Sequence, residues 1–127
     1  MNFKKILLLS AALAIGFVGI GYLAAAETMY GRYGIEILST NQFNMVRGAY
    51  GGLFLTFACL FAVGGFNRRM EFVALVSLCT FMSGFAIGRI ASIAQDGAPG
   101  TMIYALLTFE LFYTAVSAYY IKTHHQA

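Results

Sequence analysis

Residues 44–65 read NMVRGAYGGLFLTFACLFAVGG, and this stretch decides the fold of the chain. After Arg47 the next charged residue is Arg68. The uncharged interval of about 20 residues is what a helix needs to cross a hydrocarbon core about 30 Å thick. Glycine is a poor residue for a soluble helix, but in a membrane it lets a second helix approach closely. The stretch therefore predicts a transmembrane helix.

The composition of the whole chain agrees with that prediction. Its 127 residues are 60% apolar and 10% charged, and the mean hydropathy is +0.75. Soluble domains carry about 25% charged residues, so the composition argues strongly against a soluble globule. The net charge is +3, but the basic residues are scattered and form no stripe of the kind that binds nucleic acid. We expect the lipid bilayer, and no nucleic acid, as a partner.

Four apolar runs have the length of a membrane crossing, at residues 6–26, 44–65, 72–94 and 101–121. They predict one all-α domain over residues 1–127, a bundle of four transmembrane helices. The first run follows Lys4 and Lys5 and ends in three alanines, as in a secretory signal peptide. It is about 21 residues long, more than the apolar core of such a signal, so we expect a retained helix. Residues 27–43 predict a loop that lies partly on the membrane surface.

The distribution of basic residues predicts the orientation of the bundle. The termini and the central loop hold most of the basic residues, whereas the other two loops hold Arg32 alone. Because cytoplasmic loops are enriched in Lys and Arg, both termini are predicted in the cytoplasm. The expected location is the inner membrane of a bacterium, as a multi-pass protein.

Three charged residues, Arg47, Arg89 and Glu110, lie inside the predicted spans. At a rise of about 1.5 Å per residue, all three fall in the half of the bilayer remote from the termini. Charge at that depth is costly, so Glu110 is expected to pair with Arg89, and Arg47 is the competing partner. The neighbouring polar residues Tyr50, Ser92 and Asp96 complete the predicted buried charge cluster or ligand-binding site.

Such a cluster has three interpretations. It could be an ion pair that only holds the helices together, an arginine that extends to the interface without a partner, or a binding or conduction site. The sequence leaves all three open. Glycines spaced four apart form a second pattern, which predicts close helix–helix contacts at Gly48, Gly52, Gly84 and Gly88.

No pattern in the chain predicts catalysis. The glycine clusters do not lie between a strand and a helix, as a phosphate-binding loop would. Cys59 and Cys79 lie in apolar runs and are expected to be buried free thiols, and the adjacent His124 and His125 predict a solvated tail. We therefore expect no catalytic residue, no metal site, no cofactor and no enzyme activity.

The two arginine motifs carry a resemblance to a known family. The strings RGAYGG at residues 47–52, GRIAS at 88–92 and DGAP at 96–99, with the glutamate of the last span, resemble the family catalogued as domain of unknown function 4345. Its members are small bacterial membrane proteins of four predicted helices. The resemblance covers nearly the whole chain and implies no activity, substrate or cofactor. It implies importance for these residues: Arg47, Tyr50, Gly51, Gly52, Arg89, Asp96, Gly97 and Glu110.

Two functions from different classes follow from these patterns. The first is a non-enzymatic accessory or interaction subunit, bound to a larger membrane protein complex or to itself as a homo-oligomer, because the glycines favour close packing and the loops are short. The second is binding or transport of a small molecule (an anion, a lipid or a quinone) through the Arg47, Arg89 and Glu110 cluster.

Overall fold

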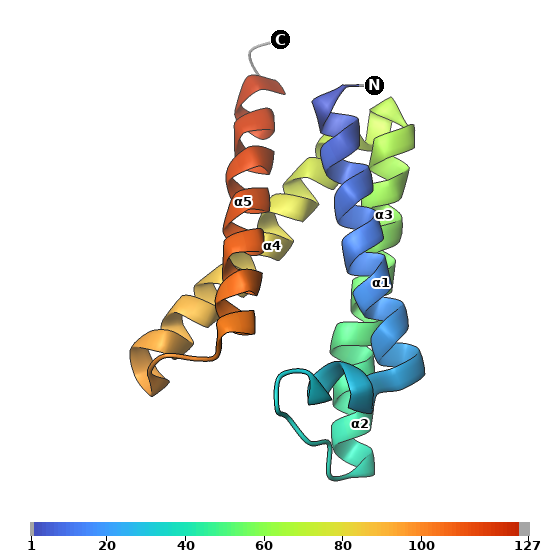
Figure 1. Cartoon of the computed structure of the whole chain (residues 1–127). Coiled ribbons are helices and arrows are strands. Elements are labelled where there is room, and N and C mark those ends of the chain that lie inside the picture. The colour runs from blue at the N-terminus through green and yellow to red at the C-terminus, as the bar shows by residue number, and fades with distance from the viewer. Residues whose placement is uncertain (1, 125–127) are drawn as a thin grey trace.

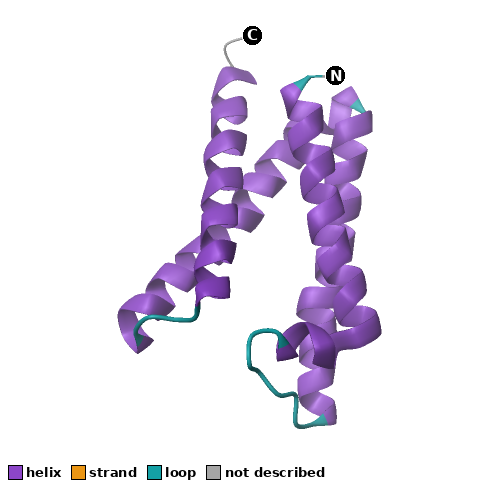
Figure 2. Cartoon of the chain, viewed as in Figure 1, coloured by secondary structure: helices purple, strands orange, loops and turns teal. Residues whose placement is uncertain are grey.

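The computed structural model describes residues 2–124, and within this range the regular structure is entirely helical (Figure 2). The elements are α1 (Phe3–Gly31), α2 (Thr40–Val46), the π-helix η1 (Arg47–Leu53), α3 (Phe54–Phe66), α4 (Arg68–Asp96) and α5 (Thr101–His124). Elements α2, η1 and α3 follow one another without a break. Four helices are thus long and apolar enough to cross a membrane, namely Phe3–Gly31, Thr40–Phe66, Arg68–Asp96 and Thr101–His124. Each predicted span lies within one of them.

The helices form two antiparallel pairs that diverge from one end of the molecule. Helix α1 packs along α3, and α4 packs along α5. Figure 1 shows α4 leaving the top of α3 and crossing obliquely, so that the pairs separate toward the bottom of the view. Both described ends of the chain and the connection from α3 to α4 lie at the same end (Figure 1). Lys4 at this end forms an ion pair with Glu71, with 3.7 Å between Nζ and Oε1.

Glycine allows the closest approach between α1 and the second helical stretch. A Cβ on Gly19 would lie 2.9 Å from the backbone nitrogen of Leu55 and 3.0 Å from the carbonyl oxygen of Gly51. Those atoms belong to the backbone and cannot move aside cheaply. Since lipid tails are as apolar as the side chains, such van der Waals packing, and not exclusion from water, holds membrane helices together.

A second close approach fixes the turn between α3 and α4. A Cβ on Gly64 would overlap the Cβ of Ala74 and lie 3.2 Å from the carbonyl oxygen of Met70. Asn67 caps the N-terminus of α4, because its side-chain oxygen accepts a hydrogen bond from the Arg69 backbone N–H at 3.0 Å. Only one residue separates the two helices, which keeps α4 against α3 at this end.

About half of the first predicted loop is helical, which corrects its predicted boundaries at both ends. Helix α1 continues to Gly31 and α2 begins at Thr40, so only residues 32–39 lie outside helices. The polar residues of this segment supply the reason, since Ser39 caps α2 by accepting a hydrogen bond from the Gln42 backbone N–H.

Helix α1 is kinked at Ala25, whose φ of −147° and ψ of 57° are not helical. After the kink the chain turns back, and the side chain of Met29 packs against Gly21. A Cβ at that glycine would lie 2.8 Å from the Met29 sulfur. The turn brings Tyr30 against Tyr22, with ring centroids 5.5 Å apart.

The core of the bundle lies near the end where the helix pairs meet. Its most deeply buried large side chains are Leu8, Phe61, Leu75, Leu78 and Met82. Helix α1 also contacts α5 here through one polar interaction, a hydrogen bond of 2.7 Å between the hydroxyls of Ser10 and Tyr113.

Three further sequence predictions differ from the structure. Cys59 is exposed on α3, and Cys79 is only partly buried. His124 is exposed, as predicted, but it is the last residue of α5 and its ring stacks on that of Phe72 with 4.6 Å between centroids, so it belongs to a helix and not to a tail. His125 lies outside the described residues.

The four glycines predicted at helix contacts do not make such contacts within the chain. Beyond the adjacent residues and the nearby backbone of the same helix, a Cβ on Gly48, Gly84 or Gly88 would meet no described atom within 4 Å, and one on Gly52 would meet only the carbonyl oxygen of Arg47, 3.9 Å away in its own helical stretch. The spacing rule fails here because η1 does not follow the α-helical period, and because the lower part of α4 diverges from α1 and α3. The closest approaches to the backbone of another helix occur instead at Gly19 and Gly64.

Candidate functional site

Arg89 and Glu110 form a two-point ion pair between α4 and α5. Arg89 Nε donates to Glu110 Oε1 at 2.7 Å, and Nη2 donates to Oε2 at 2.9 Å. The Glu110 side chain is 7% exposed and that of Arg89 is 22% exposed. This is the predicted pairing of the deepest charge. The paired geometry suits the planar guanidinium, and it neutralises a carboxylate that would otherwise be buried alone.

The helices on which they lie explain how these two residues meet. They occur one on each side of the short α4–α5 connection, near the end where that helix pair lies apart from α1. Arg89 also lies over the ring of Phe85, one turn earlier on α4, with 5.7 Å from its central carbon to the ring centroid. Nε and Nη2 contact the carboxylate, so the N–H groups of Nη1 are left outside the ion pair.

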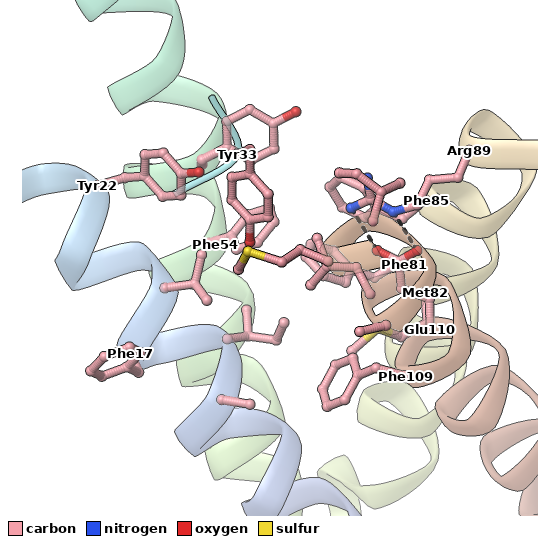
Figure 3. A pocket seen from close by; sticks show the side chains of 18 of the residues that line it. Phe17, Tyr22, Tyr33, Phe54, Phe81, Met82, Phe85, Arg89, Phe109 and Glu110 are labelled. Carbon is pink, nitrogen blue, oxygen red and sulfur yellow. Dashed lines mark hydrogen bonds and ion pairs between the residues drawn. The ribbon is translucent and has the colours of Figure 1, made fainter. Parts of the chain in front are cut away.

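The charge pair forms one side of a cavity of about 570 Å³, which we call the main cavity. It lies between α1, the end of α2–η1–α3 that carries Tyr50, and the α4–α5 pair. Figure 3 shows Arg89 and Glu110 facing the tyrosine side of the cavity across it. Apart from the pair and four tyrosine hydroxyls, the walls consist of aromatic, aliphatic and methionine side chains, among them Ile15, Phe17, Val18, Phe54, Phe81, Met82, Phe85, Met102, Leu106 and Phe109.

Four tyrosines line the main cavity, namely Tyr22, Tyr30, Tyr33 and Tyr50. The ring of Tyr50 lies 5.3 Å from that of Tyr22 and 5.9 Å from that of Tyr30, measured between centroids. The rings continue through Phe54 and Phe85 toward the charge pair. The result is an aromatic wall with polar tips, a combination that suits a ligand with both an apolar body and oxygen atoms.

The main cavity reaches the outer surface of the bundle between α1 and α5. Phe17 of α1 and Met102 of α5 both line it, and they are 65% and 47% exposed. Helices α1 and α5 contact each other little, and their contact lies at the other end, near Ser10 and Tyr113. A ligand can therefore reach the cavity from the side of the bundle.

Arg47 does not join the predicted cluster, which corrects the three-charge arrangement. Its side chain is exposed and lies over the ring of Phe43, 5.0 Å from the centroid. Arg47 is the first residue of the π-helix η1, in which side chains follow a different angular period from that of an α-helix. Tyr50, three residues later, is the member of η1 that faces the cavity.

The two other predicted polar residues lie outside the charge pair. Ser92 and Asp96 are exposed near the end of α4, and the Ser92 hydroxyl donates to Asp96 Oδ2 at 3.4 Å. Asp96 contacts neither predicted arginine. Ser92 lines a second cavity, together with Arg89, Gly84 and Gly88. The predicted site residues Tyr50, Arg89 and Glu110 therefore come together, whereas Arg47 and Asp96 do not.

The aromatic wall is the part of the site that sequence reasoning missed. Phe81, Phe85 and Arg89 are spaced four apart on α4, so the helical period alone places them on one face. That spacing was sufficient to predict the α4 side of the cavity. The kink at Ala25, which brings Tyr30 to Tyr22 and Tyr50, has no comparable pattern in the sequence.

Within residues 2–124 no group of three His, Cys, Asp or Glu side chains is placed to hold a metal ion.

Comparison with curated proteins and with solved structures gives no match. A family model does match residues 3–120, nearly the whole chain, and this range includes the two arginine motifs and the glutamate of α5. The chain therefore belongs to the family described as Domain of unknown function (DUF4345).

Proposed function

We propose that this protein is a membrane-embedded binding protein for a small amphiphile, which it takes from the lipid phase into the main cavity. The observation that carries the proposal is the Arg89–Glu110 pair, which forms a polar side of a largely apolar cavity of about 570 Å³. A pair that served only to join α4 and α5 would not need open space beside it. The volume is within the range of about 300–1,000 Å³ typical of small-molecule sites.

The charge balance of the site specifies the kind of ligand. Glu110 already neutralises Arg89, and Arg47 contacts Phe43 instead of the cavity, so no uncompensated positive charge faces the ligand. A strongly anionic ligand would therefore have to displace Glu110 from Arg89. The free N–H groups of Arg89 and the tyrosine hydroxyls suit uncharged oxygen acceptors, such as carbonyl or ether groups. The aromatic and aliphatic walls suit a ring or an alkyl chain.

The proposed location of the protein rests on its apolar helices and on its basic residues. The four long apolar helices support a membrane position, and the basic residues support an inner membrane with both termini in the cytoplasm. In that orientation the main cavity lies in the half of the bilayer remote from the cytoplasm. Its opening between α1 and α5 faces lipid tails, so the ligand enters laterally. No catalytic step is proposed.

A second candidate function is that of an accessory subunit bound to a larger membrane complex or to a second copy. The observation in its favour is Gly48, which is exposed on η1 with open space beside it and lines neither of the two cavities. A partner helix could approach closely there. Gly84 and Gly88 no longer support this function by themselves, since both line a cavity.

Tyrosine fluorescence tests the binding proposal. The chain has no tryptophan and eight tyrosines, so tyrosines dominate its emission, and four of them line the main cavity. Decyl-benzoquinone, an uncharged amphiphile that quenches tyrosine, is titrated into the detergent-solubilised protein. We expect saturable quenching.

The matched variants are Ala105→Phe and Ala118→Phe, both on exposed positions of α5. Ala105 lines the cavity and Ala118 does not. Ala105→Phe should weaken binding about tenfold, because a side chain that intrudes on a fitted ligand costs about 1–3 kcal/mol. Ala118→Phe should leave it unchanged. Quenching that never saturates, or that is the same in both variants, would contradict the proposal.

A further inference from the structure

A second cavity, of about 590 Å³, adjoins the main cavity at Arg89. Five residues line both cavities, namely Tyr50, Phe81, Phe85, Arg89 and Ile103. The two spaces therefore share a wall made of one guanidinium, three aromatic rings and one isoleucine. The second cavity continues toward the α4–α5 connection, where Ser92, Gly97 and Pro99 line it. It thus lies closer to the membrane interface than the main cavity does.

Two glycines of α4 supply the floor of this second cavity. Gly84 and Gly88 both line it, and a Cβ on either would meet no described atom within 4 Å beyond the adjacent residues and the nearby backbone of α4. Glycine in a helix interior costs about 1 kcal/mol relative to alanine. Within residues 2–124 no neighbouring helix packs against these two positions, so no close helix–helix contact compensates for that cost. Their effect in the fold is to keep the space beside Arg89 open.

We infer that the two cavities form one elongated site, in which the second cavity holds a planar, carbonyl-bearing ring and the main cavity holds the apolar chain attached to it. This inference rests on the proposed function and assigns the ligand to the chemical class of quinone-like ring amphiphiles. Gly84 and Gly88 then determine specificity, since their missing side chains set the size of the ring compartment.

The walls of the second cavity favour a planar ring over a compact polar head. Tyr50, Phe81 and Phe85 offer aromatic surfaces, and the Tyr50 and Phe85 rings are 6.4 Å apart between centroids. Arg89 and the Ser92 hydroxyl supply hydrogen-bond donors at its edge. A charged head would find no unpaired counter-charge here, because Arg89 is held by Glu110. A carbonyl oxygen, in contrast, needs only a hydrogen-bond donor, which Arg89 or Ser92 can supply.

The test compares two probes with the same chain length and different heads. Decyl-benzoquinone carries a ring, whereas bromodecanol carries only a hydroxyl and quenches tyrosine through its heavy atom. Gly88→Phe fills the ring compartment from a position where nothing is displaced at the Cβ. It should weaken binding of decyl-benzoquinone about tenfold, by the same steric cost, and leave that of bromodecanol unchanged. Gly84→Leu is a second blocking variant, should Gly88→Phe fold poorly.

Ala91→Phe is the matched control, because Ala91 is exposed on the same helix and lines neither cavity. It should leave both probes unaffected. If Gly88→Phe and Gly84→Leu bind both probes like the wild type, or weaken both probes equally, the ring compartment is refuted. In that case the Ala105→Phe variant still tests binding in the main cavity. The proposed function can therefore hold even if the ring compartment is refuted. If neither probe quenches the wild-type protein saturably, both proposals fail together.

Discussion

Glu110 of α5 accepts two hydrogen bonds from the guanidinium of Arg89 on α4, one to each carboxylate oxygen, at 2.7 and 2.9 Å. The pair joins two helices of the bundle and at the same time supplies the charged groups of a largely apolar cavity. Both roles follow from one geometry, since two-point pairing turns the remaining N–H groups of the guanidinium away from the carboxylate.

The pair predicts an unusual order of stabilities. Glu110→Ala should be more destabilising than the double change of Glu110→Ala with Arg89→Leu, because the single change leaves Arg89 without its partner. The expected cost of the single change is about 3 kcal/mol or less, since Arg89 is partly exposed. Thermal unfolding in mild detergent measures the order.

Arg47→Leu is the control for that series. Arg47 contacts Phe43 and not Glu110, so its removal should change the unfolding temperature little. A double variant less stable than Glu110→Ala, or an Arg47→Leu variant as unstable as either, would contradict the assigned pairing.

Alanine substitutions at two glycines should distinguish a closely packed position from one with space beside it. Gly19→Ala places a Cβ 2.9 Å from the Leu55 backbone nitrogen and should lower the free energy of unfolding by about 1–3 kcal/mol. Gly84→Ala meets nothing and should be neutral, or stabilising by up to about 1 kcal/mol. Chemical unfolding in detergent compares the two. Equal losses at both positions would mean that α4 packs against a neighbour.

The hydroxyl contact between Ser10 and Tyr113 should contribute measurably to the joining of α1 and α5. Tyr113→Phe keeps the ring and removes the 2.7 Å hydrogen bond, so a loss of about 1 kcal/mol is expected. Tyr119→Phe is the control, because Tyr119 is 60% exposed on the same helix. If both changes have the same effect on the unfolding temperature, the contact adds no stability.

The predicted orientation is tested by fused reporters. A reporter that is active only in the cytoplasm should be active when fused after residue 127 or inserted at Asn67, and inactive when inserted at Ala98. The reason is the excess of Lys and Arg on the loops of one end. Activity at Ala98 and not at Asn67 would reverse the orientation.

The sequence predicts the helices better than it predicts the site. Runs of apolar residues specify four spans, because hydrocarbon thickness sets their length, and the pairing of Glu110 follows from the cost of a buried charge. The positions of Arg47 and of the close-packed glycines depend on the π-helix at residues 47–53 and on the angle between the helix pairs. Those features arise from packing between segments far apart in the chain, and the spacing of residues within one helix does not predict them.

The main cavity depends on the same long-range features. Tyr30 reaches it only because α1 kinks at Ala25, and α4 leaves space for it only because that helix crosses obliquely (Figure 1). Its α4 wall, formed by Phe81, Phe85 and Arg89, was not predicted, although the spacing of four residues places the three side chains on one face of the helix.

Native mass spectrometry can test whether the main cavity binds a ligand in the membrane. The protein is extracted from its own membrane into lipid nanodiscs and is released from them in the spectrometer. We expect the wild-type protein to carry an uncharged amphiphile, the Ala105→Phe variant to lose it and the Ala118→Phe variant to keep it. A wild-type protein with no added mass, or an amphiphile retained equally by both variants, would contradict the claim that the cavity beside Arg89 and Glu110 is a binding site.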